Sequence, residues 1–108
     1  MILGPSGENI YPEEIESVIN SHSMVLESLV QENKGRLVAL VHFNAEKLEQ
    51  WKAETYKSMS EKIEIIKQEL HIYVNARVNK FSRIAIVIEQ PLSFEKTPTQ
   101  KIKRYLYM

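Results

Sequence analysis

The distribution of apolar positions predicts a helix close to the start of the chain. Ile15, Val18 and Ile19 recur at the three- and four-residue spacing that places side chains on one face of a helix. Pro12 stands just before this stripe, where proline is favoured as the first helical residue, and several glutamates follow in the positively polarised first turns. We therefore expect a first helix that begins at Pro12 and ends near residues 20–22.

Three later segments have the composition of strands. Residues 24–30 form the first, and residues 36–43 are a near-continuous apolar run, typical of a strand in the middle of a covered sheet. The Glu-Asn-Lys-Gly sequence between them predicts a tight turn. Residues 83–89 are the clearest strand, which Pro91 ends. We expect Phe94 to anchor the following loop on the core.

Two more helical patterns lie between the second and third strands. Asn44 is a good N-cap for the first of these helices, and Ser58 or Ser60 for the second. The second is the longer, and we expect it to run to about Asn79, with Asn75 or Asn79 kinking or ending it. Its apolar stripe consists of Ile63, Ile66, Leu70 and Val74.

Together these segments predict an α+β domain with a three-stranded sheet covered by two or three helices. Residues 1–11 add a short strand, a Gly-Pro-Ser-Gly turn and a loop, which predicts a small N-terminal β-hairpin. At the other end, Pro98 stiffens a loop and Thr99 can cap a short terminal helix over residues 101–107. The 108 residues suffice for one hydrophobic core and not for two.

Composition and charge exclude several classes of function. The 14 basic residues balance the 14 acidic ones, which argues against a dedicated nucleic-acid binder. No apolar run approaches the ~20 residues of a membrane span, and no signal peptide is visible, so we expect no transmembrane segment and a cytoplasmic location. The chain has no cysteine, and its three glycines are not clustered as a phosphate-binding loop requires. His22 and His42 have no surrounding cluster of ligands, so we expect no metal site.

The end of the chain departs from this neutral balance. From Lys96 onwards it carries four basic residues and no acidic one. A basic run near a terminus is ordinarily a solvated tail. Here, however, Pro98 and Thr99 would place Lys101 at the point where a stiff loop becomes a helix. The residues by themselves leave both interpretations open, a solvated tail and a positioned lysine.

Two stretches carry a resemblance to a known family. Residues 97–104, Thr-Pro-Thr-Gln-Lys-Ile-Lys-Arg, resemble the closing motif of the AMP-forming acyl-CoA synthetases and their adenylating relatives, Thr-x-Thr/Ser-Gly-Lys-Ile/Val-x-Arg. Gln100 stands where that family commonly has glycine. Residues 6–16, Ser-Gly-Glu-Asn-Ile-Tyr-Pro-Glu-Glu-Ile-Glu, are similar to the segment that begins the family's small C-terminal domain. The two motifs occur in the family's order and bracket nearly the whole chain.

The resemblance implies that residues 1–108 are a mobile, lysine-bearing C-terminal domain. A large N-terminal domain, its partner, would bind ATP, Mg²⁺ and a fatty acid, and Lys101 would be the catalytic residue in acyl-adenylate formation. The loop around Gly7 would then face coenzyme A during thioester formation. The residues expected to contact the nucleotide or coenzyme A are Gly7, Glu8, Thr99 and Arg104. We expect none of these cofactors to bind tightly to this chain alone, which should be inactive by itself.

The resemblance leaves the acid and the acceptor open. Residues 95–101 have the sequence pattern Glu-Lys-Thr-Pro-Thr-x-Lys, which is frequent in relatives with longer-chain substrates. This resemblance favours a long-chain fatty-acid–CoA ligase. One alternative is the same domain in another adenylating enzyme, a carrier-protein ligase or a luciferase-like protein. The other is a non-enzymatic interaction domain with a basic tail.

Overall fold

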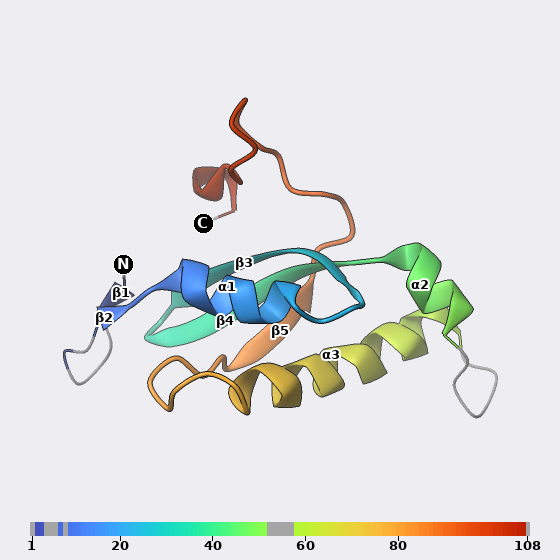
Figure 1. Cartoon of the computed structure of the whole chain (residues 1–108), viewed down its shortest axis with the longest axis horizontal. Coiled ribbons are helices and arrows are strands. Elements are labelled where there is room, and N and C mark those ends of the chain that lie inside the picture. Colours follow the sequence, from blue (N-terminus) through green and yellow to red (C-terminus); the bar gives the residue numbers. More distant parts are fainter. Residues whose placement is uncertain (1, 4–6, 8, 52–57, 108) are drawn as a thin grey trace.

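A three-stranded sheet forms the centre of the fold, with strand β4 in the middle (Figure 1). The computed structural model describes residues 2–3, 7, 9–51 and 58–107. The α+β class, the N-terminal hairpin and the covered sheet predicted from the sequence are all confirmed. In chain order the elements are β1 (Ile2–Leu3), β2 (Asn9–Ile10), α1 (Pro12–Asn20), β3 (Val25–Asn33), β4 (Arg36–Phe43), α2 (Ala45–Gln50), α3 (Met59–Asn75), β5 (Ile86–Glu89) and the 3-10 turn η1 (Arg104–Leu106).

The sheet is mixed, because β4 pairs differently with its two neighbours. β3 and β4 are antiparallel and joined by a two-residue loop, in which Lys34 and Gly35 have φ angles of 53° and 79°. Positive φ at both central positions is the signature of a type I′ turn, whose twist suits a hairpin. β5 runs parallel to β4, with Val38 opposite Ile86. The central position of β4 explains why its sequence is apolar almost throughout.

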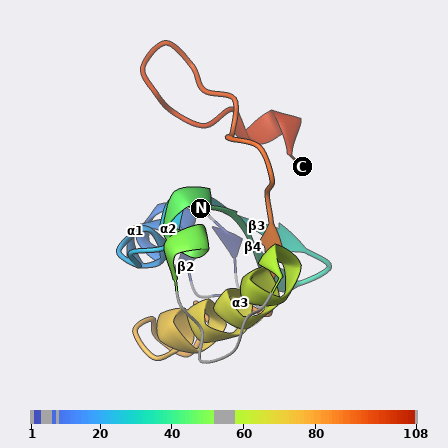
Figure 2. The same ribbon diagram turned by 90° about the vertical axis from the view of Figure 1, so that its right-hand side faces the viewer.

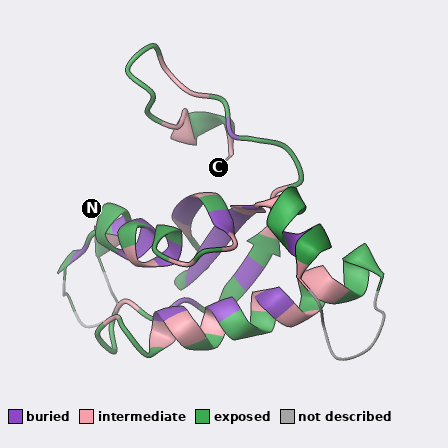
Figure 3. Ribbon diagram, turned by 45° about the vertical axis from the view of Figure 1, so that its right-hand side comes forward, coloured by how far each residue is buried: buried purple, intermediate pink, exposed green. Residues whose placement is uncertain are grey.

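The helices cover one face of the sheet. Alternate residues of a strand point to opposite faces, and Ala39 and Val41 of β4 point towards the helices. They pack there in one cluster with Ile19 of α1 and Leu70 of α3. The buried stripe of α3 faces the sheet in Figure 3. Within the described residues, no helix combines the length and the apolar composition that crossing a bilayer requires.

The C-terminal segment covers part of the other face. Val38 and Leu40, the residues of β4 that alternate with the helix-facing ones, pack with Leu29 of β3 and with Phe94. Phe94 is only 3% exposed, which confirms that it anchors the last loop on the core. Figure 2 shows this segment on the opposite side of the sheet from α3. The basic end of the chain therefore begins at a fixed point of the fold.

The ends of two elements differ from the prediction because of one side chain. α3 ends at Asn75, one of the two asparagines expected to kink or end it, and so stops short of the predicted end near Asn79; β5 begins at Ile86 rather than residue 83. The amide of Asn75 donates to the carbonyl of Ile84 at 3.0 Å and accepts from its N–H at 2.9 Å. These bonds fix the approach to β5 against the last turn of α3, before the ladder with β4 begins.

Asn75→Ala should lower the free energy of unfolding by about 1–3 kcal/mol, because the N–H of buried Ile84 would lose its partner. Urea unfolding of the chain, followed by circular dichroism, measures the change. Gln68→Ala, at an exposed position of the same helix, is the matched control and should cost less than about 0.5 kcal/mol. Equal losses in the two variants would contradict this role for Asn75.

Candidate functional site: the lysine hairpin

Residues 95–103 form a short antiparallel hairpin, here called the lysine hairpin, instead of leading into a helix. Lys96 pairs with Ile102 across it. The N–H of Thr97 donates to the carbonyl of Lys101 at 2.7 Å, and the N–H of Lys103 donates to the carbonyl of Glu95 at 2.8 Å. The helix predicted over residues 101–107 is therefore wrong, and only the 3-10 turn η1 follows. The carbonyl of Lys101 accepts from the N–H of Thr97 across the hairpin, so it does not accept the first hydrogen bond of a helix.

The turn of the hairpin is held by backbone and hydroxyl groups. The N–H of Gln100 donates to the carbonyl of Thr97 at 2.9 Å, and the hydroxyl of Thr97 accepts from the N–H of Lys101 at 3.2 Å. The hydroxyl of Thr99 lies 3.0 Å from that of Thr97. Thr99 therefore stabilises the turn, and its predicted role as a helix cap is wrong.

Gln100 adopts the left-handed conformation, with φ of 65°. This region is open to glycine and costs other residues about 1–2 kcal/mol. The glycine commonly found here in the motif that residues 97–104 resemble is thus explained by the backbone. The glutamine of this chain departs from that pattern and takes the same left-handed region that glycine enters without cost.

Lys101 lies in this turn with an exposed side chain. Its N–H and C=O are both bonded to Thr97, so its backbone is fixed. Within the described part of the chain, its ammonium group forms no hydrogen bond or ion pair. A charge on a defined backbone and open to solvent is available to a ligand or to another surface.

Arg104 is anchored to the body of the domain. Its Nη2 lies 2.6 Å from Oε1 of Glu16 in α1, and its Nη1 donates to the carbonyl of Val30 at 3.3 Å. The second oxygen of Glu16 accepts from the N–H of Val30 at 2.7 Å. β3 is an edge strand, so the Arg104–Glu16 pair satisfies edge groups that a further strand would otherwise bind. The guanidinium of Arg104 was predicted to contact a cofactor; in this structure it binds Glu16 and the carbonyl of Val30 instead.

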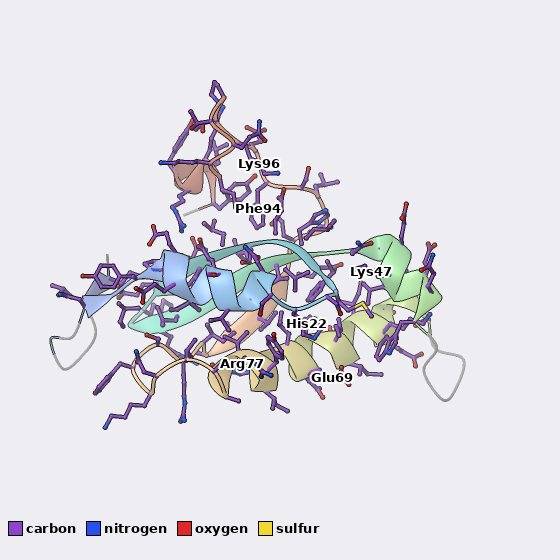
Figure 4. All side chains as sticks on the ribbon, in the orientation of Figure 1. His22, Lys47, Glu69, Arg77, Phe94 and Lys96 are labelled. Carbon is purple, nitrogen blue, oxygen red and sulfur yellow. The ribbon has the colours of Figure 1, made fainter. Side chains whose placement is uncertain are left out.

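The start of the hairpin is tied down in the same manner. Lys96 forms an ion pair with Oε1 of Glu27 in β3, and Oε2 of that glutamate accepts from the N–H of Phe94 at 3.0 Å. The N–H of Glu95 donates to the hydroxyl of Tyr107 at 2.7 Å. The rings of Phe94 and Tyr107 meet edge to face at 5.0 Å. Figure 4 shows Phe94 between the C-terminal segment and the sheet.

A groove of about 870 Å³ separates the lysine hairpin from α1 and β3. Its lining combines both signs of charge. The acidic members are Glu13, Glu16 and Glu27, and the basic members include Lys96, Lys101 and Arg104. Because the acidic groups lie beside the basic ones, the groove lacks the uniform positive potential that would hold a polyphosphate. This groove therefore does not form a phosphate site around Lys101.

Gly7 lies in a different part of the domain. It belongs to the connection between β1 and β2, and this N-terminal hairpin is at one end of the molecule, away from the lysine hairpin (Figure 1), whereas Ile2 of β1 and Arg104 line one pocket. Its φ is 82°, and a Cβ built there would meet nothing within 4 Å. The residue therefore permits a left-handed backbone next to open space. The structure does not bring Gly7 and Lys101 together, and Glu8 lies outside the described residues.

The two histidines singled out in the sequence have structural contacts. Nδ1 of His22 accepts from the N–H of Met24 at 3.2 Å, and its ring meets Tyr73 edge to face at 5.0 Å. Burial lowers the pKa of His22; nearby Glu69 opposes that shift and Arg77 adds to it (Figure 4). His42 bonds through Nδ1 to the carbonyl of Gln90 at 2.8 Å. Among the described residues, no three His, Asp or Glu side chains gather as metal ligands would.

Glu16 and Glu27 are the site residues that the sequence analysis missed. Each lies 69 or more positions from its basic partner in the C-terminal segment. The only local signal is an acidic residue beside the apolar stripe of a helix, or within a strand, where a carboxylate needs a partner if it is buried.

Gln100→Gly should stabilise the lysine hairpin by about 1 kcal/mol, because glycine adopts the left-handed backbone without steric cost. Hydrogen exchange at the amide of Thr97, which bonds across the hairpin, should slow by about fivefold. Thr99→Gly is the matched control, since the φ of Thr99 is not positive and the added backbone freedom should speed exchange. The same response to both variants would show that the conformation of Gln100 is not strained.

Comparison with known proteins finds similar chains among solved structures, and those reported below are CoA synthetases or ligases. No family model matches the sequence, and no curated protein matches it significantly. Among solved structures, Mycobacterium tuberculosis fatty acyl CoA synthetase is similar with a TM-score of 0.66 and 27% identity, over 99% of this chain and 18% of that chain.

Two ligases of other acids are similar to nearly the same extent. A benzoate CoA ligase from Burkholderia xenovorans has a TM-score of 0.63 and 25% identity, over 93% of this chain and 18% of that chain. O-succinylbenzoate coenzyme A synthetase from Bacillus subtilis, in complex with AMP, has a TM-score of 0.63 and 25% identity, over 97% and 18%. This chain thus spans less than a fifth of each of these proteins. It has the fold of one domain of the acyl-CoA synthetases and related AMP-forming CoA ligases, the family that its two terminal motifs resemble.

Proposed function

We propose that this chain is the mobile C-terminal domain of an AMP-forming fatty-acid–CoA ligase. The observation that carries the proposal is an exposed lysine on a fixed hairpin. The fold around it matches part of a CoA ligase over 99% of this chain. In this role Lys101 stabilises the negative charge that develops as a carboxylate attacks the α-phosphate of ATP. The remaining part of such a ligase, a large N-terminal domain, supplies the site for ATP, Mg²⁺ and the acid.

Electrostatics explain why the lysine needs that second domain. Two unit charges about 4 Å apart interact by ~1 kcal/mol in water and by ~4 kcal/mol at an effective dielectric near 20. Lys101 on this chain alone is exposed and therefore contributes at the lower end of that range. Docking the hairpin into a closed cleft raises the contribution. This is why the isolated chain should not form acyl-adenylate.

The separation of the two predicted functional segments supports a two-step role. The N-terminal hairpin and the lysine hairpin lie on different parts of the domain (Figures 1 and 2). A rotation between steps would withdraw Lys101 after adenylation and bring the Gly7 loop towards the thiol of coenzyme A. Thr99 would contribute to the face used in adenylation, and Glu8 to the face used in thioester formation. Arg104 would act mainly through the protein contacts described above.

A fatty acid is the acid that we favour. The sequence of residues 95–101 favours a fatty acid, and one similar structure is a fatty acyl CoA synthetase. Ligases of benzoate and succinylbenzoate are about as similar, so the domain fold does not discriminate between acids. The alternatives are another adenylating enzyme, such as a carrier-protein ligase, and a non-enzymatic interaction domain. Half-reactions measured with fatty acid, coenzyme A and carrier protein distinguish them.

Lys101→Ala in the full-length enzyme should lower adenylation by about 10²-fold or more, because the positive charge is needed only while the acyl-adenylate forms. Fatty-acid-dependent exchange of pyrophosphate into ATP measures this step. Thioester formation from pre-made acyl-adenylate should be largely unchanged.

Lys103→Ala is the matched control, since it removes the same charge from the same hairpin. A diffuse basic patch would respond equally to both changes, and equal responses would contradict the assignment of Lys101. Arg104→Ala is a poorer control, because it also breaks the contacts with Glu16 and Val30.

Gly7→Trp in the full-length enzyme should impair thioester formation and spare adenylation, because a bulky side chain beside the path of coenzyme A would obstruct the thiol. Gly7→Asn is the control for backbone strain, since asparagine tolerates positive φ and is small. If the asparagine variant loses as much thioester activity as the tryptophan variant, Gly7 serves only the turn.

A further inference from the structure

Two glutamates hold the lysine hairpin at both of its ends. Glu27 of β3 pairs with Lys96, where the hairpin begins, and Glu16 of α1 pairs with Arg104, just after it ends. Lys101 lies between these two attachment points. We call Glu16 and Glu27 the carboxylate clamp.

Both carboxylates divide their oxygens in the same way. One oxygen of Glu16 binds Arg104 and the other accepts from the N–H of Val30. One oxygen of Glu27 binds Lys96 and the other accepts from the N–H of Phe94. Each carboxylate thus accepts from a backbone N–H with one oxygen and binds its basic partner with the other. Such charge-assisted bonds are shorter and more directional than contacts between neutral groups.

The burial of the clamp favours a defined geometry. The side chains of Glu16 and Glu27 are 11% and 17% exposed. A carboxylate that is largely withdrawn from water needs its hydrogen-bond partners, so it tolerates few alternative arrangements. Glu13 offers a contrast on the same helix: it lies 3.7 Å from Arg104 with its side chain 68% exposed, and such surface pairs contribute little.

Apolar contacts alone would leave the hairpin less well oriented. Ile102 and Tyr107 are only partly buried against the cluster that contains Phe94. Hydrophobic contacts are non-directional, so they hold the hairpin near the sheet without fixing its angle. The clamp adds directional bonds from two elements, α1 and β3, which themselves pack on each other.

We propose that Glu16 and Glu27 are positioning residues that set the orientation of the Lys101 hairpin on the domain. The inference rests on the proposed function for its catalytic consequence, because orientation matters only if Lys101 must reach a reacting phosphate. A displacement of about 1 Å can lower a reaction rate up to about 10²-fold. Neither glutamate touches substrate in this role. Each acts through the hairpin.

The test uses Glu16→Gln and Glu27→Gln, which keep the shape of the side chain and one acceptor oxygen while removing the charge. Glu13→Gln is the matched control, an identical change one turn earlier in α1 at an exposed position. In the full chain, hydrogen exchange is followed at the hairpin amides of Thr97 and Lys103 and at the core amide of Val41. In the full-length enzyme, the two half-reactions and the KM for ATP are measured.

If the clamp positions the hairpin, the two variants should exchange the hairpin amides about tenfold faster, with Val41 unchanged. The kcat of adenylation should fall by at least about tenfold with little change in the KM for ATP, and thioester formation should be retained. Glu13→Gln should behave as the unmodified protein. Unchanged hairpin exchange would overturn the proposal, and so would parallel losses in Val41 protection and in both half-reactions, which indicate a general loss of stability.

The result also separates this inference from the proposed function. If Lys101→Ala leaves adenylation intact, the proposed function fails, and the exchange data still decide whether Glu16 and Glu27 orient the hairpin. If Lys101→Ala abolishes adenylation while the clamp variants loosen the hairpin without slowing that step, the function stands and the positioning role is wrong. If Lys101→Ala abolishes adenylation and the clamp variants both loosen the hairpin and slow that step, the proposed function and the positioning role are both supported.

Discussion

The burial of β4 on both of its faces is the constraint on which the rest of the structure depends. One face carries Ala39 and Val41 against the helices, and the other carries Val38 and Leu40 against Phe94. The helices pack on the first face, and the C-terminal segment covers part of the second. Phe94 is buried for that reason, and the loop after β5 is drawn back over the sheet. The basic end of the chain is therefore attached to the fold at its base.

This attachment gives the four basic residues at the end of the chain different roles. Lys96 and Arg104 are paired with carboxylates of the body, whereas Lys101 is exposed on the turn between them. Counting charges cannot separate these roles, because all of the residues contribute equally to a basic tail. Their positions on the hairpin do separate them. A lysine held on a fixed backbone and exposed to solvent suits a domain that delivers a charge to a site elsewhere.

The edge of the sheet provides the physical link between the fold and the lysine hairpin. Val30 on edge strand β3 has an N–H and a carbonyl that bind Glu16 and Arg104 in place of another strand. The pair thus protects an edge that would otherwise be open to pairing with other chains. The same contact joins α1, which follows the N-terminal hairpin, to the residue that ends the lysine motif.

The sequence by itself determined the features whose causes are local. Pro12 starts α1, Asn44 caps α2 through its side chain, and the apolar run of residues 36–43 marks the central strand. Each of these depends on neighbouring residues or on a simple periodicity. The terminal motif likewise singled out Lys101 as a candidate residue and pointed to the family that the chain resembles, because that signal consists of adjacent residues.

Tertiary structure decided the features whose causes are distant. A helix over residues 101–107 is locally reasonable, but Ile102 and Tyr107 pack on the cluster around Phe94, and the backbone forms a hairpin to place them there. α3 ends at Asn75 because that side chain binds Ile84 beyond the helix. Glu16 meets Arg104 across 88 positions of the sequence. No local pattern specifies such a contact, because only the packing of α1, β3 and the C-terminal segment brings the two charges together.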